Sequence, residues 1–141
     1  KINNGSNGRD FIASLYGMTN KSFSELLSVA RSWAQAPEMK ITKGNYKNLG
    51  YDRSERAYKI KSLSTEKNVS MYFAATNSSP VNNLSIIILN GGHSNPNILI
   101  DGKEINNGAS FRYGIRNTLV GADIILWLEI KREEPFNITL N

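Results

Sequence analysis

The stretch 84–105, LSIIILNGGHSNPNILIDGKEI, decides the fold of this chain. It opens with an aliphatic run at 84–89 that has the length of a strand, which is typical of a central strand covered on both faces. It closes with Asp101-Gly102 between two apolar arms, the pattern of a tight β-hairpin. The polar segment 90–97 joins these two regions. The stretch therefore predicts a sheet whose strands are linked by turns and loops.

Alternation with a period of two continues on both sides of this stretch. It appears around 39–41, 58–60 and 69–75, and again over 111–115, 123–131 and 136–140. Asn, Gly and Ser separate the segments, and no helices alternate with them. Eight or nine short strands of this kind predict a mainly β chain folded as an antiparallel β-sandwich. A jelly-roll and an immunoglobulin-like arrangement both fit the pattern.

One helix precedes the strands. Apolar residues recur there at spacings of three and four, and form one stripe over about residues 23–35: Phe23, Leu26, Leu27, Ala30, Trp33 and Ala34. Ser22 and Glu25 have the spacing of a capping box, and Pro37 ends the helix. We therefore expect a tether or remnant of a preceding region at 1–18, a linker helix at 19–36 and the sandwich at 37–141.

Composition excludes several classes of site. The chain has 141 residues, no cysteine and one histidine, so disulfides, thiolate chemistry and sites with two imidazoles are excluded. We predict no cofactor and no metal. The net charge is +5, but the basic residues are scattered and interrupted by acids, so no nucleic-acid partner is expected. The apolar runs are too short to span a bilayer, and no membrane span is predicted.

Trp127 is the first candidate ligand-binding residue. The segment 123–131 alternates between two faces. Its core side carries Ile124, Leu126, Leu128 and Ile130, and Ile125 and Trp127 point toward the other face. An outward indole suits stacking against a sugar ring. Alternatively, another part of the same polypeptide covers it, either the helix that carries Trp33 or a further domain.

The loop 90–97 supplies further candidates. It contains His93 and Asn95 between two strong strands, a common position for recognition residues in sandwich domains. Tyr113, on a neighbouring strand in the sequence, is the third candidate beside Trp127. A lyase-like site would need a Tyr or His base with a cation nearby, and His93, Tyr113, Arg112 and Arg116 form the one such grouping that the sequence offers. An alternative for the loop is a wide glycine turn with an idle histidine.

Asp52 and Glu55 are a pair of carboxylates in the segment 51–58, YDRSERAY. Each has an arginine next to it in the sequence, which would keep both groups ionised, whereas acid catalysis needs one of them protonated. We therefore expect a surface cluster of ion pairs at the entrance of a strand.

Three segments together resemble a known group of proteins: YGMTNKSFSELLSVARSWAQAPEM at 16–39, YDRSERAY at 51–58, and SSPVNNLSIIILN at 78–90 followed by ILIDGKEI. They resemble the C-terminal β-sandwich regions of large secreted bacterial proteins of the Bacteroidetes type that degrade polysaccharides. The resemblance implies an extracellular or periplasmic accessory domain that follows a catalytic region. It supplies no catalytic or ligand-binding residue.

Three functions follow as expectations. The first is a noncatalytic accessory module of a carbohydrate-active protein that binds a glycan through aromatic residues, with an upstream domain of the same polypeptide and a polysaccharide as partners. The second is a structural module that packs between domains and binds no ligand. The third, a small polysaccharide lyase or hydrolase, is the least favoured, because catalytic residue types are scarce in the chain.

Overall fold

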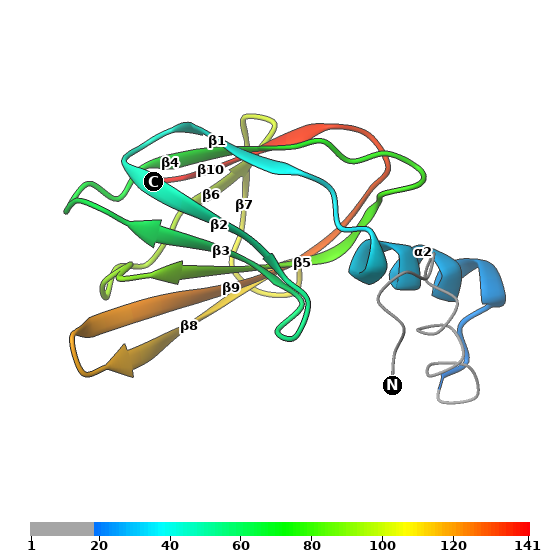
Figure 1. Ribbon diagram of the computed structural model, residues 1–141, viewed down its shortest axis with the longest axis horizontal. Coiled ribbons are helices and arrows are strands. Elements are labelled where there is room, and N and C mark those ends of the chain that lie inside the picture. The colour runs from blue at the N-terminus through cyan, green and yellow to red at the C-terminus, as the bar shows by residue number, and fades with distance from the viewer. Residues whose placement is uncertain (1–18) are drawn as a thin grey trace.

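Two stacked sheets with one helix at their end make up the described part of the chain (Figure 1). The computed structural model describes residues 19–141, and the expected tether at 1–18 lies outside the described residues. The elements are α2 (Phe23–Ala34), β1 (Met39–Lys43), β2 (Tyr46–Asp52), β3 (Ala57–Ser62), β4 (Val69–Phe73), β5 (Val81–Leu89), β6 (Ile98–Ile100), β7 (Lys103–Ile105), β8 (Phe111–Thr118), β9 (Gly121–Arg132) and β10 (Phe136–Leu140). The predicted mainly β sandwich with one N-terminal helix is confirmed.

Each sheet has five strands, in the orders β1-β4-β10-β6-β7 and β2-β3-β5-β9-β8. Neighbouring strands are antiparallel except for β3 and β5, which are parallel. The chain between these two strands passes through β4, which lies in the opposite sheet, and this excursion returns β5 to the direction of β3. The sandwich is therefore mixed at this one pair of strands.

The core lies between the two sheets. Phe73, Phe136 and Tyr58 are buried there, with the rings of Phe73 and Phe136 stacked at 5.0 Å between centroids. The aliphatic run in β5 occupies the middle of its sheet, as predicted. Ile86 and Ile88 face the core, and Ile87 on the opposite face is also only 5% exposed, so this strand is covered on both faces.

The helix begins and ends close to the predicted positions. The Ser22 hydroxyl accepts a hydrogen bond from the backbone N–H of Glu25, and the Glu25 carboxylate accepts one from the backbone N–H of Ser22, which completes the capping box. The Ser22 hydroxyl also donates a hydrogen bond to the Glu25 carboxylate, and this bond together with the one from the Ser22 backbone N–H lowers the pKa of Glu25. The helix ends at Ala34, three residues before Pro37. No helix within residues 19–141 is long and apolar enough to cross a bilayer.

Strand β2 was not expected from the sequence, which suggested eight or nine strands, whereas residues 19–141 form ten. It lies at the edge of its sheet, and a bulge between Asn48 and Gly50 interrupts its register with β3. An edge strand with a bulge lacks the regular alternation by which a half-buried strand is recognised. The hairpin at Asp101-Gly102 is confirmed, with φ angles of +50° and +78° at these two residues.

Candidate functional site

The outer face of the sheet β2-β3-β5-β9-β8 carries the candidate site. Side chains alternate between the faces of each strand, so the residues that flank the core residues of β9 lie on this outer face. Cross-strand pairing arranges them in rows. One row contains Ser85, Trp127 and Arg112, and the next contains Lys59, Ile87, Ile125 and Gly114. The outward direction predicted for Trp127 is thereby confirmed, since its neighbours Leu126 and Leu128 are fully buried.

Trp127 is half-buried, and its main polar neighbour comes from the edge strand β8. The guanidinium carbon of Arg112 lies 5.4 Å from the centre of the indole ring. Arg112 itself is exposed. A cation in this position is attracted to the aromatic face of the indole. Sequence reasoning did not find this pair, because it depends on the register between β8 and β9.

A gap lies beside Trp127. Gly114 has no neighbouring atom within 4 Å of the position that a Cβ would occupy, and it stands opposite Ile125, which is 36% exposed. On the other side of this gap, the Arg116 side chain donates two hydrogen bonds to Oδ2 of Asp123, at 3.0 and 3.3 Å. The face therefore offers an indole, an exposed aliphatic side chain and two guanidinium groups, which come from Arg112 and Arg116 of β8.

Lys59 joins the carboxylates of Asp52 and Glu55 near the opposite edge of this face. Its Nζ lies 2.7 Å from Asp52 and 3.2 Å from Glu55. Asp52 also accepts hydrogen bonds from the Ser54 hydroxyl and from backbone N–H groups, and Lys59 together with these donors holds the pKa of Asp52 well below the usual range. The hydrogen bonds with Asp52 and Glu55 raise the pKa of Lys59. The expected surface ion-pair cluster exists, but its cation is Lys59.

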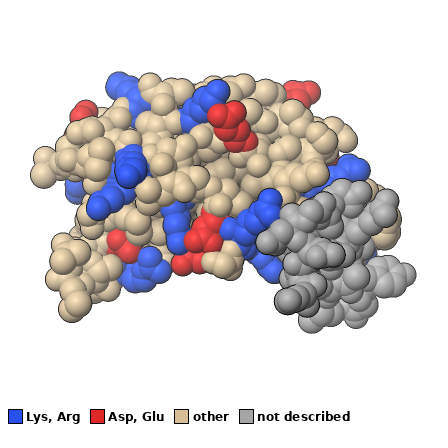
Figure 2. Space-filling view, in the orientation of Figure 1, with Lys and Arg blue, Asp and Glu red and all other residues tan. Residues whose placement is uncertain are grey.

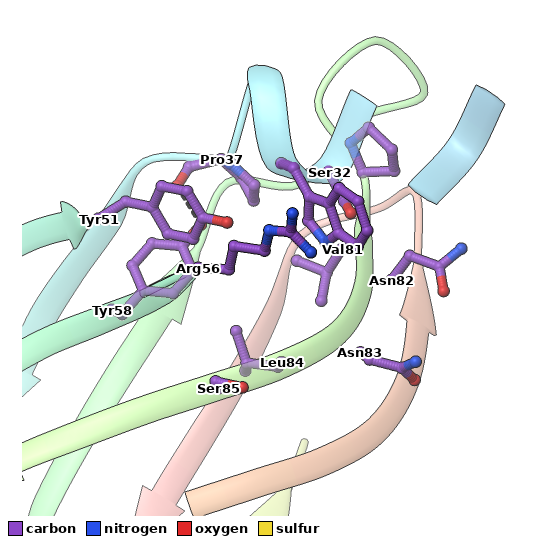
Figure 3. Close-up of a pocket in the computed structure, with 12 residues that line it drawn as sticks. Ser32, Pro37, Tyr51, Arg56, Tyr58, Val81, Asn82, Asn83, Leu84 and Ser85 are labelled. Carbon is purple, nitrogen blue, oxygen red and sulfur yellow. Dashed lines mark hydrogen bonds between the residues drawn. The ribbon is translucent and has the colours of Figure 1, made fainter. Parts of the chain in front are cut away.

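The two arginines of that segment serve the helix instead. Arg53 Nη2 donates a hydrogen bond to the carbonyl of Ala34 at 3.3 Å, and the guanidinium of Arg56 lies 3.8 Å from the centre of the Trp33 ring. Figure 3 shows Arg56 extending toward the helix beside Tyr51 and Tyr58. Burial raises the pKa of Tyr51 to about 12, so its phenol is neutral at physiological pH. The cavity at this junction measures about 10 Å³, the space of one water molecule.

The other predicted site residues lie on the opposite side of β8. The Tyr113 hydroxyl donates a hydrogen bond of 2.5 Å to Oδ1 of Asn95, and Nε2 of His93 lies 3.1 Å from Oδ1 of Asn117. The loop 90–97 therefore contacts β8, and this contact brings His93 and Asn95 to the side of β8 that carries Tyr113. Trp127 does not join them, because it lies on the outer face.

The lyase-like grouping is not assembled. Tyr113 faces inward and stacks on Phe111 at 5.9 Å, whereas Arg112 and Arg116 face outward to Trp127 and Asp123. A strand cannot direct adjacent residues to the same face, so no base on the Tyr113 side has either arginine beside it.

Charges on the molecule are mixed. Figure 2 shows basic atoms scattered over the visible face, with acidic atoms beside several of them. Within residues 19–141, no three histidine, aspartate or glutamate side chains lie close enough together to hold a metal ion. The described surface thus offers separate small clusters of charge.

Comparison with known proteins leaves the site to be interpreted from its own geometry. No protein-family profile, no curated protein and no solved structure matches the chain.

Proposed function

We propose that this chain is a noncatalytic accessory module of a secreted, carbohydrate-active protein, and that it binds a glycan on the outer face of the sheet β2-β3-β5-β9-β8. The observation that carries the proposal is the half-buried indole of Trp127 on a regular sheet face, with Arg112 beside it and the open space at Gly114 next to it. The resemblance of three segments to accessory regions of polysaccharide-degrading proteins supports the choice of ligand class and an extracellular or periplasmic location.

The chemistry of the face suits a sugar ring. The flat indole complements the apolar face of a pyranose, and the exposed side chain of Ile125 extends that apolar area. The guanidinium groups of Arg112 and Arg116 are hydrogen-bond donors for ring hydroxyls or for a carboxylate. The site thus combines an apolar base with polar groups around it, as ligand sites generally do.

A glycan array tests the proposal, followed by calorimetric titration of the oligosaccharide that binds best. Trp127→Ala should weaken binding at least tenfold, because it removes most of the stacking area. Tyr72→Ala is the matched control, since Tyr72 is a half-buried aromatic residue on the opposite sheet. Equal affinity of the wild type and Trp127→Ala would contradict the proposal, as would an array without any bound glycan.

A second candidate function is a structural module that packs between domains without a ligand. The junction of α2 with the sandwich favours it. Arg56 lies over Trp33, Arg53 and Ser79 donate hydrogen bonds to the last carbonyls of the helix, and Asn82 donates one to Ser28. These contacts fix the direction of the helix relative to the sheets, which is what a connector between domains requires.

Fluorescence quenching separates the two candidates. With excitation selective for tryptophan, the variant Trp33→Phe reports on Trp127 alone, and Trp127→Phe reports on Trp33 alone. An accessible Trp127 that quenches strongly with acrylamide, and is protected when the oligosaccharide is added, supports the binding module. Strong protection of both indoles without ligand supports the structural module.

A further inference from the structure

The end of the sandwich opposite α2 carries exposed aliphatic side chains that the fold does not use. Leu119 and Val120 are 106% and 88% exposed at the turn between β8 and β9, and Leu63, at the start of the β3–β4 loop, is 55% exposed. In Figure 1 this turn and this loop are the parts of the chain that extend furthest to the left. We call them the distal tips.

The turn at Leu119-Val120 is closed by strand pairing on both sides, and its residues are unusual for a turn. Pairing between β8 and β9 continues to Thr118 and Gly121, and the Thr118 hydroxyl donates a hydrogen bond to the carbonyl of Gly121. Two-residue turns generally contain Gly, Asn or Asp, because these residues tolerate the required backbone angles and favour water. Leucine and valine at these positions therefore expose apolar surface on a fixed support.

Unpaired lysines surround the distal tips. Lys47 and Lys61 are exposed neighbours across the β2–β3 pair, and Lys43 and Lys67 lie in or beside the adjoining turn and loop. None of the four has an ion-pair partner among residues 19–141. Glu66 is the one acid in the turns and loops of this end, at 43–46, 62–68, 89–97 and 118–121. Figure 2 shows two mostly uncharged lobes at the left, with basic atoms between them and a few acidic atoms at their edges.

We propose that this end binds the surface of an anionic lipid bilayer. Leu119, Val120 and Leu63 enter the boundary between headgroups and acyl chains, and the lysines contact lipid phosphates. Apolar insertion combined with basic charge is the general mode of peripheral attachment to membranes. The lysine charge is complementary to the anionic headgroups.

The geometry favours a bilayer over a protein partner. The two tips are separated and project beyond the part of the chain that lies between them, so one flat surface contacts both (Figure 1). A protein partner would need a complementary surface of roughly 1,000 Å² with a packed centre. A fluid bilayer accepts separate apolar tips without such complementarity. The proposal uses residues away from Trp127, so it stands independently of the glycan site.

Sedimentation with vesicles tests the proposal. The whole chain is mixed with vesicles of phosphatidylcholine alone, or of phosphatidylcholine with phosphatidylglycerol, and the bound fraction is measured as a function of lipid and salt concentration. We expect binding to the anionic vesicles that falls as salt rises. The double variant Leu119→Ser/Val120→Ser should bind at least tenfold more weakly, because it removes the inserted aliphatic groups. Lys47→Gln/Lys61→Gln should lose roughly fivefold for each charge.

Matched controls come from the other parts of the molecule. Phe23→Ser removes an exposed apolar residue at the start of α2, and Lys40→Gln/Lys103→Gln removes two exposed lysines of the other sheet. Both should bind like the wild type. The proposal is overturned if the wild type does not sediment with anionic vesicles, if it binds neutral vesicles equally well, or if Leu119→Ser/Val120→Ser binds unchanged while its melting temperature is retained.

Discussion

The hydroxyl of Tyr58 donates a hydrogen bond of 2.6 Å to the carbonyl of Pro37, the proline that follows the helix. Tyr58 is 3% exposed, and its ring lies 5.1 Å from that of Phe73 in the core. Burial raises the pKa of Tyr58 far above its usual value, so the hydroxyl donates this bond at any physiological pH. One residue thus joins the core to the segment between helix and sheet.

Removal of this hydroxyl tests its contribution to stability. Tyr58→Phe leaves the Pro37 carbonyl without its donor in a buried place, and the free energy of unfolding should fall by about 1–3 kcal/mol. Urea denaturation measures the change. Tyr72→Phe is the control, since the Tyr72 hydroxyl has no hydrogen bond among residues 19–141 and should change stability little. Equal loss in the two variants would show that the Pro37 contact contributes nothing.

The Asp52–Lys59 pair predicts a dependence of stability on pH. The pKa of Asp52 is lower in the folded protein than that of an aspartate in an unfolded chain, about 3.9, so the ionised carboxylate stabilises the fold above that pH. This contribution is lost as the pH falls through the folded pKa. Asp52→Asn should therefore be less stable than the wild type at neutral pH, and the difference should shrink progressively below about pH 4.

Thermal unfolding followed by circular dichroism at several pH values measures this difference. Lys59→Met tests the same pair from the other side. The pKa of Lys59 is raised, so the contribution of its charge is present below its usual value and is lost as the pH rises through the folded pKa. A difference between Asp52→Asn and the wild type that is constant from acidic to neutral pH would contradict the assignment.

Gly44 predicts a backbone constraint at the turn between β1 and β2. Its φ angle is +102°, and a Cβ at this position would collide with the backbone oxygen of Asn68. Gly44→Ala should lower the free energy of unfolding by about 1–3 kcal/mol, measured by urea denaturation. Gly114→Ala is the matched control, because nothing lies near its Cβ position and its φ is not in the left-handed region. A Gly44→Ala variant as stable as Gly114→Ala would refute the constraint.

Local signals in the sequence predicted local structure well. The Ser22–Glu25 capping box and the Asp101-Gly102 hairpin were found because each depends on residues within a few positions of one another. The outward direction of Trp127 followed from alternation within a single strand. The parallel pairing of β3 and β5 was not predicted, because alternation carries no information on the direction of a neighbouring strand.

The arrangement of the candidate site could not be predicted from the sequence, because it depends on contacts between segments that are far apart in the chain. The pairing of Arg112 with Trp127, and that of Tyr113 with Asn95, depend on the register of β8 and on the course of the loop 90–97. No spacing in the sequence encodes either contact. The ion pair of Lys59 with Asp52 was also not predicted, because Arg53 and Arg56 are closer to the carboxylates in the sequence. In the structure, these two arginines contact the helix.

Strand β8 ends its sheet, and this position has a consequence for the behaviour of the protein in concentrated solution. The Glu129 N–H donates a hydrogen bond to the Ser110 carbonyl, and along β8 every second residue from Ser110 onward bonds to β9 in this way. The residues between them, Tyr113 and Ile115, therefore direct their N–H and C=O groups away from β9. Such an edge is a template for another copy. In the antiparallel register centred on Gly114, however, Arg112 of one copy would stand opposite Arg116 of the next. Repulsion between these like charges opposes edge-to-edge polymerisation.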